Sequence, residues 1–175
     1  MGRPRTVLVL GGARSGKSRH AQALAEATGG ERVFIATAQA FDAEMRDRIA
    51  RHRADRDETW RTVEAPTTLQ QAIRENDAAG RVLLIDCLTL WVSNLLLVDQ
   101  PLGAASDDLL GAIAESRAAI ILVSNEVGFG IVPDNALARR FRDGAGILNQ
   151  RLAAACDAVD LVVAGLSLRM KGSAV

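Results

Sequence analysis

The residues best suited to chemistry form one short run, Gly11-Gly12-Ala13-Arg14-Ser15-Gly16-Lys17-Ser18. This run fits the pattern G-x-x-x-x-G-K-[ST], and it lies between an apolar segment and a segment with helical patterning. Glycines let the backbone curl so that successive N–H groups point at phosphate oxygens, and a helix that begins near Lys17 adds its positive end. Lys17 can reach the β- and γ-phosphates, and the Ser18 hydroxyl can bind Mg²⁺. The run therefore predicts a cradle for the phosphates of GTP or ATP.

Two carboxylates follow apolar segments elsewhere in the chain. Asp86 comes directly after Val82–Ile85, where a phosphate-binding loop needs an acidic residue to position magnesium. The alternative is that Asp86 caps the next helix. Glu126 follows the apolar segment 120–124 after one asparagine, and it either orients a substrate hydroxyl as a general base or is an ordinary loop carboxylate.

The chain contains two histidines in different settings. His20 lies in the expected first helix, where a surface or packing role is the simpler interpretation. His52 lies among arginines, and on a helix Arg48 and Arg56 share its face. Nearby positive charge favours the neutral imidazole, which is a nucleophile, and guanidinium groups can hold a triphosphate for attack at the α-phosphorus. The plainer alternative is a solvated basic helix that contains a histidine.

These residues must be positioned by strands and helices that alternate along the chain. Short apolar runs typical of strands covered on both faces lie at 6–10, 33–36, 81–85, 119–124 and 161–164, and a further short strand is possible at 61–64. Helical patterning lies at 17–27, 42–54, 67–76, 107–116 and 135–155. This alternation predicts an α/β fold, a P-loop NTPase-like three-layer sandwich with a mostly parallel central sheet.

We expect residues 1–175 to form a single P-loop nucleotide-binding domain, because neither half could bury its own sheet. The segment 97–106, which contains Pro101 and Gly103, is expected to be a flexible surface loop. Hydrophobic residues make up 49% of the chain, which is enough for a substantial core.

Composition also argues against several classes of partner. The 21 basic and 21 acidic residues cancel, so the chain lacks the positive field that general nucleic-acid binding or a basic membrane surface requires. No apolar run approaches the length of a membrane span, and the N-terminus lacks a signal-peptide layout. Cys87 and Cys156 lie apart in apolar surroundings, which favours buried free thiols. We expect a cytoplasmic protein.

Taken together, these segments closely resemble the bifunctional adenosylcobinamide kinase / adenosylcobinamide-phosphate guanylyltransferase family of cobalamin biosynthesis. The resemblance covers nearly the whole chain, apart from 97–116, and it is far more specific than the glycine-rich run. It is carried by 11–19, 35–38, Asp42, 44–45, 48–49, 52–53, Arg56, 60–62, Glu64, 86–89, 91–92, 94–95, 124–128, 130–133 and 149–153. One small departure is Asp57, where a proline is common in the family.

The resemblance implies two reactions. A nucleoside triphosphate phosphorylates the aminopropanol hydroxyl of adenosylcobinamide, and GTP then transfers GMP onto that phosphate with release of pyrophosphate. A family histidine carries the GMP covalently, and His52 matches it. The resemblance also implies a homotrimer. The implied nucleotide contacts are Gly11, Gly12, Ala13, Arg14, Ser15, Gly16, Lys17, Ser18, Ala36, Thr37, Ala38, Arg53, Ala54, Asp55, Arg56, Glu64 and Asp86.

Two other functions are compatible with the glycine-rich run alone. One is a kinase of another small alcohol, in which His52 has no catalytic role. The other is a GTP-binding regulatory protein, which usually carries an NKxD-type motif for guanine. No such motif is present in the sequence.

Overall fold

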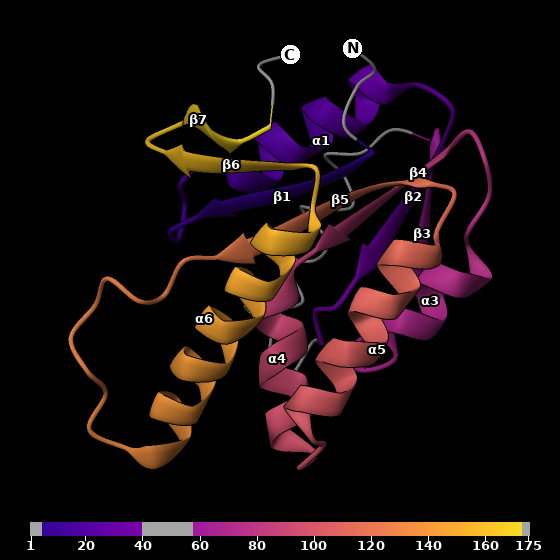
Figure 1. Cartoon of the computed structure of the whole chain (residues 1–175). Helices are drawn as coiled ribbons and strands as arrows, with labels where there is room; N and C mark the ends of the chain where they lie inside the picture. The colour runs from indigo at the N-terminus through magenta and orange to yellow at the C-terminus, as the bar shows by residue number, and fades with distance from the viewer. Residues whose placement is uncertain (1–4, 40–57, 173–175) are drawn as a thin grey trace.

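The computed structural model describes residues 5–39 and 58–172. Strands and helices alternate along most of this part of the chain (Figure 1). In order they are β1 (Thr6–Gly11), α1 (Lys17–Thr28), β2 (Glu31–Ala36), β3 (Trp60–Glu64), α3 (Leu69–Glu75), β4 (Arg81–Asp86), α4 (Leu88–Leu97), α5 (Leu102–Glu115), β5 (Ala119–Asn125), α6 (Ala136–Ala155), β6 (Ala158–Val163) and β7 (Leu166–Lys171). The helix expected at 42–54 lies outside the described residues.

The strands form one seven-stranded sheet in the order β3-β2-β4-β5-β1-β6-β7. Each pair of neighbours is parallel except β6 and β7, which form an antiparallel hairpin. This arrangement confirms the expected mostly parallel sheet. Because β1, β2, β4 and β5 are parallel, their carboxyl ends meet at one edge of the sheet, which is where ligands bind in open α/β folds.

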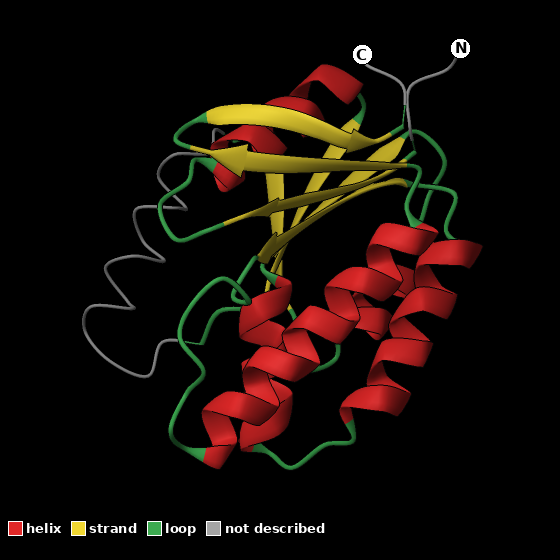
Figure 2. Cartoon of the chain, turned by 60° about the vertical axis from the view of Figure 1, so that its left-hand side comes forward, coloured by secondary structure: helices red, strands yellow, loops and turns green. Residues whose placement is uncertain are grey.

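Helices cover both faces of the sheet. Helix α1 packs on one face, and α3, α4, α5 and α6 pack on the other (Figures 1 and 2). Side chains of β1 alternate between the two layers: Val7 and Val9 join the core under α1, whereas Leu8 joins the larger core under the other helices. These three layers, and the glycine-rich loop between β1 and α1, are those expected of a P-loop α/β protein.

The prediction of a flexible loop at 97–106 is wrong for 102–106, which form the start of α5. Helix α4 ends at Leu97, and α5 begins at Leu102, five residues before the expected helix start. Pro101 occupies the N-cap position of α5 with φ −65°, a value that suits the start of a helix. The Ser106 hydroxyl, inside α5, donates to the Leu102 carbonyl one turn earlier. Proline therefore marks a helix start here rather than a loop.

Two elements were not expected from the sequence. Helix α4 buries Leu88, Trp91, Val92 and Leu95 fully, so it lacks the polar face that identifies an amphipathic helix. Strand β7 lies at the sheet edge and pairs only with β6.

Strand β6 also begins three residues earlier than expected. It starts at Ala158, and it ends at Val163 rather than Ala164, which has a positive φ of 52°. The short strand expected near 61–64 is confirmed as β3. Both cysteines are free and buried, as expected. Among the described residues, no helix has both the length and the apolar character needed to cross a membrane.

Candidate active site

The glycine-rich run forms a compact turn between β1 and α1. The Ser15 N–H donates to the Gly12 carbonyl at 3.3 Å, and the Lys17 ammonium donates to the same carbonyl at 3.2 Å. Gly16, at the N-cap of α1, has φ 93°, a left-handed conformation that glycine adopts without strain. The lysine is therefore held back over the loop, at the positive end of the helix.

Gly11 is required by close packing at the base of this turn. A Cβ at Gly11 would lie 2.5 Å from the Ser15 hydroxyl oxygen and 2.6 Å from the Val162 carbonyl oxygen. The Ser15 hydroxyl is buried and has no hydrogen-bond partner within the described part of the chain. Buried polar groups are rarely left without a partner. This hydroxyl therefore marks the loop as a place where a polar ligand can add a missing hydrogen bond.

The C-terminal hairpin supports the loop from the other side. The N–H of Gly165, in the turn between β6 and β7, donates to the Ser15 carbonyl at 2.8 Å. On the same hairpin, buried Asp160 accepts a hydrogen bond from Arg169 and lies 2.8 Å from His20 Nε2. His20 is the fourth residue of α1, and this contact fits the surface or packing role expected for it. The hairpin thus fixes both the loop and the first turns of its helix.

Asp86 ends β4, two strands away from β1 in the sheet. Adjacent strands are about 4.8 Å apart, so the two strand ends are separated by about 10 Å, a gap that a metal–phosphate group spans. The N-cap position of α4 is occupied by Cys87, not by Asp86, which weighs against the capping alternative. Burial raises the pKa of the Cys87 thiol; the Asp86 carboxylate raises it further, and Lys17 opposes this. Asp86 and Lys17 are therefore close enough to act on one buried thiol.

The donor set at this edge fits magnesium. The Ser18 hydroxyl and the Asp86 carboxylate are oxygen ligands, and α1 packs over β4. Mg²⁺ usually takes one or two protein ligands and fills its other positions with phosphate oxygens and water. Residues 5–39 and 58–172 contain no group of three or more His, Cys, Asp or Glu side chains that could hold a metal ion.

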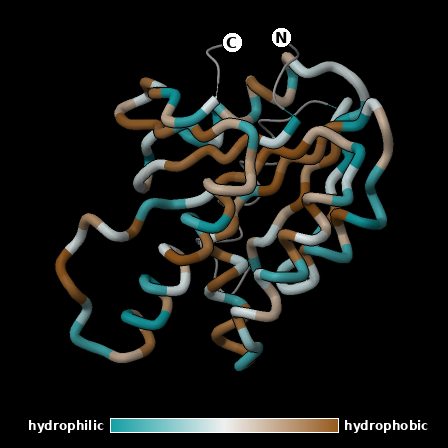
Figure 3. Tube along the Cα trace, viewed as in Figure 1, coloured by the Kyte–Doolittle hydropathy of each residue, from teal (hydrophilic) through white to brown (hydrophobic). Residues whose placement is uncertain are grey.

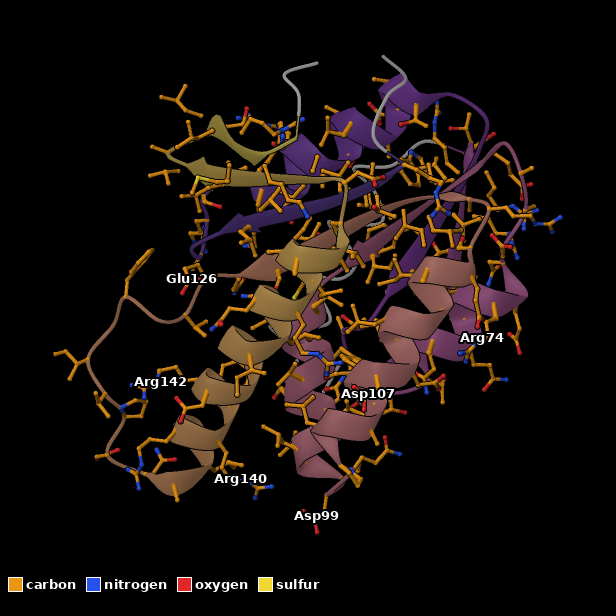
Figure 4. All side chains as sticks on the ribbon, in the orientation of Figure 1. Arg74, Asp99, Asp107, Glu126, Arg140 and Arg142 are labelled. Carbon is orange, nitrogen blue, oxygen red and sulfur yellow. The ribbon has the colours of Figure 1, made fainter. Side chains whose placement is uncertain are left out.

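Glu126 follows β5 at the same edge and lies beside the phosphate loop (Figure 4). Its N–H donates to the Gly11 carbonyl at 3.1 Å, and its carboxylate accepts from the Gly128 N–H at 2.7 Å. Asn125, the preceding residue, is fixed by two buried side chains: its N–H donates to Thr89 Oγ1 and its carbonyl accepts from Asn149 Nδ2. The backbone of Glu126 is therefore rigidly placed, as a group that orients a substrate needs to be.

The segment Ala36–Ala38 follows β2 at this edge. The side chain of Thr37 is fully buried, and its hydroxyl donates to the Cys87 carbonyl and accepts from the Cys87 N–H. A nucleotide contact from this segment would therefore come from the backbone or from Ala36 and Ala38. The role of Thr37 in joining two strand ends has no signal in the sequence, because threonine is common in loops.

The remaining residues expected to bind nucleotide lie further away or outside the described part. Glu64 ends β3, four strand positions from β1, which corresponds to about 19 Å. That separation suits the nucleoside end of a nucleotide rather than its phosphates. His52 and 53–56 lie outside the described residues.

The fold and this site define a P-loop nucleotide-binding enzyme of the α/β class. Residues 7–170 match the model of the family described as cobinamide kinase / cobinamide phosphate guanyltransferase. The chain belongs to this family.

Two curated relatives agree with this assignment. The chain is 52% identical over 167 residues to the bifunctional adenosylcobalamin biosynthesis protein CobP of Pseudomonas aeruginosa, covering 94% of this chain and 96% of that protein. It is 43% identical over 180 residues to the bifunctional adenosylcobalamin biosynthesis protein CobU of Escherichia coli K12, and the match covers 94% of this chain and 99% of that protein. A solved structure from Pyrococcus horikoshii OT3 shares the fold, with a TM-score of 0.52 at 11% identity over 99% of this chain and 89% of that one. The chain is therefore a bifunctional kinase and guanylyltransferase of adenosylcobalamin biosynthesis.

Proposed function

We propose that the chain phosphorylates the aminopropanol hydroxyl of adenosylcobinamide with ATP or GTP, and then transfers GMP from GTP onto that phosphate. The products of the second reaction are adenosylcobinamide-GDP and pyrophosphate. Family membership supports this pair of reactions. The observation that carries the proposal in the structure is the meeting of Lys17, Asp86 and Glu126 at one edge of the sheet.

In the kinase reaction, the loop N–H groups and Lys17 hold the β- and γ-phosphates. Ser18 and Asp86 would hold Mg²⁺, which neutralises charge as it develops on the phosphates. Glu126 accepts the proton of the substrate hydroxyl while the hydroxyl oxygen attacks the γ-phosphorus. The bond from the γ-phosphorus to the bridging oxygen breaks, and the nucleoside diphosphate leaves. Lys17 and the helix end stabilise the charge on that oxygen.

In the guanylyl transfer, a ring nitrogen of His52 attacks the α-phosphorus of GTP. A P–N bond forms, and the bond to the β-phosphate breaks, which releases pyrophosphate. A phosphate oxygen of adenosylcobinamide phosphate then attacks the same phosphorus and frees the histidine. The family resemblance and the arginines around His52 support this route. We also infer that the nucleotide contacts include Arg53 and Arg56, and that the chain forms a homotrimer.

The covalent step is tested with GTP labelled at the α-phosphate. Wild-type protein should retain label that is stable in alkali and labile in acid, as expected for phosphoramidate. His52→Ala should retain none. The chain offers a matched control in its second histidine: His20→Gln, which keeps a polar group beside Asp160, should retain the label. Retention of label by His52→Ala would contradict the assignment.

The order of the two reactions is read from product masses. Adenosylcobinamide with GTP should give the phosphate and then the GDP derivative, and added ATP should not be required if GTP serves both reactions. A product that contains phosphate but never GMP would leave the chain as a kinase alone.

A further inference from the structure

The connection between β5 and α6 carries apolar side chains that are exposed on the surface of the single chain. Phe129 is 90% exposed, Ile131 96% and Val132 62%. The connection leaves the sheet after Glu126 and runs outward before α6 begins (Figures 1 and 3). Exposed apolar residues grouped in this way mark binding surfaces in folded proteins. We call Phe129, Ile131 and Val132 the apolar loop.

The apolar loop begins beside the phosphate cradle. Glu126 is joined to Gly11 by the hydrogen bond from its N–H. Consecutive Cα atoms are about 3.8 Å apart, so the Cα of Phe129 lies within about 11 Å of that of Glu126. The apolar loop therefore starts within about 11 Å of a residue that is hydrogen-bonded to the base of the cradle. A molecule that places one atom at the γ-phosphate can rest its remaining part on this loop.

A second apolar face flanks the cradle on the same side of the sheet. Val162 joins the core under α1, so Val163, the next residue, points to the opposite face. Leu166 pairs with Val163 across the hairpin, and both side chains are exposed. The turn between them holds the phosphate loop through Gly165. The apolar loop and this hairpin face therefore both lie on the side of the sheet that α6 covers.

The substrate of the proposed kinase reaction determines what such a surface must bind. The hydroxyl that is phosphorylated lies at the end of an arm on a large macrocycle whose ring carbons and methyl groups are apolar. The arm enters the cradle, and the macrocycle stays outside it. The charged phosphates of a nucleotide gain little from exposed phenylalanine and isoleucine, and binding of its base to the loop is the outcome that a raised Kd for GTP would report. We propose that the apolar loop binds the corrinoid macrocycle and holds its arm towards Glu126. This assignment rests on the proposed function, and it names the substrate surface of that same site.

The test compares two double variants of the full-length protein. Phe129→Ser with Ile131→Ser removes the apolar loop. Leu97→Ser with Val98→Ser is the control, because these residues are also exposed and apolar but end α4 at its far end. Asp99, the next residue, lies well away from Glu126 in Figure 4. Cobinamide binding is measured by equilibrium dialysis in the presence of a non-hydrolysable GTP analogue. Steady-state kinetics give the KM of cobinamide and of GTP, and light scattering gives the molar mass of each variant.

We expect the loop variant to raise the Kd and KM of cobinamide about tenfold or more, the loss expected when one large apolar contact is removed. The Kd and KM of GTP, and all values of the control, should change less than about twofold. Unchanged cobinamide values in the loop variant overturn the proposal, and so do equal losses in both variants. A change of molar mass confined to the loop variant also overturns it, because the loop then joins copies of the chain. If wild-type protein binds no cobinamide, the proposed function fails with it.

Discussion

The N–H of Glu126 donates a hydrogen bond to the carbonyl oxygen of Gly11. This bond joins the residue after β5 to the last residue of β1, so a carboxylate and the phosphate loop are held at a fixed separation. Thr89 and Asn149 fix the preceding residue from the neighbouring helices. Positioning of this kind is the main contribution a protein makes to phosphoryl transfer.

Lys17→Ala should reduce the kinase and guanylyl-transfer rates by about 100-fold or more, because the ammonium stabilises charge on the phosphates in both reactions. Initial rates of both reactions and the Kd of GTP measure the effect. The chain has one other lysine, Lys171, whose ammonium donates to the Ala153 and Ala154 carbonyls at the end of α6. Lys171→Ala should leave both rates near wild type. Equal losses in the two variants would refute a specific role for Lys17.

Glu126→Gln separates the two reactions. Loss of a general base costs about 100-fold or more, so the kinase rate should fall by that amount. Transfer of GMP to supplied adenosylcobinamide phosphate should change little, since that reaction does not use Glu126 as a base. The glutamine oxygen can still accept the Gly128 N–H, so the local backbone is preserved. Glu115→Gln, on the exposed end of α5, is the control. A kinase rate unaffected by Glu126→Gln means that the residue is an ordinary loop carboxylate.

The sequence predicted the layers of the fold because they depend on local signals. Buried parallel strands are continuous apolar runs, and the glycine-rich run sits between a strand and a helix, so β1, β4 and β5 were recognised directly. The same signals are absent from α4, which is apolar around most of its circumference, and from the first half of β6, which contains a buried aspartate. Such elements depend on partners that are distant in sequence.

The candidate site divides in the same way. The sequence singled out Lys17, Asp86 and Glu126 because each follows an apolar strand segment, directly or within a few residues. The residues that hold them in place were not predictable. Asn149 is 24 residues from the carbonyl it binds, and Asp160 is 140 residues from His20. Contacts over such separations are set by strand order, which a sequence pattern does not contain.

Asp77→Asn should make stability depend less on pH. Burial alone would raise the pKa of the Asp77 carboxyl, but hydrogen bonds from Ser116, Ala118 and Arg117 outweigh it and lower the pKa to about 2 from its ordinary 3.8. A lowered pKa stabilises the folded state above the ordinary value, and this contribution is lost as the pH falls from 3.8 towards 2. The ionised carboxylate should therefore contribute about 1–2 kcal/mol at pH 7.

Urea unfolding of wild type and Asp77→Asn at pH 7, 5, 3 and 2 measures this contribution. The difference in free energy of unfolding should be constant from pH 7 to 5 and should shrink below pH 4. Asp99→Asn provides the comparison, because the Asp99 side chain is 93% exposed. It should differ little from wild type at every pH. A difference for Asp77→Asn that does not change between pH 7 and 2 would contradict the role of its charge.

Asp160→Asn should destabilise the fold and weaken nucleotide binding together. Asp160 is only 2% exposed, and it accepts hydrogen bonds from Arg169 while lying 2.8 Å from His20. The substitution removes the negative charge that faces the largely buried Arg169 guanidinium, which costs about 2–4 kcal/mol in the free energy of unfolding. The Kd of GTP should also rise, because the same hairpin holds the phosphate loop through Gly165.

The control for Asp160→Asn is Asp143→Asn, which removes an ion pair with Arg142 on the surface of α6. Exposed pairs are worth less than about 1 kcal/mol, so this variant should unfold near the wild-type urea concentration and bind GTP normally. The GTP measurement is made well below the unfolding midpoint, where both variants are folded, so that a higher Kd reports on the loop. If Asp160→Asn loses stability but binds GTP as wild type does, the hairpin stabilises the sheet edge without positioning the cradle.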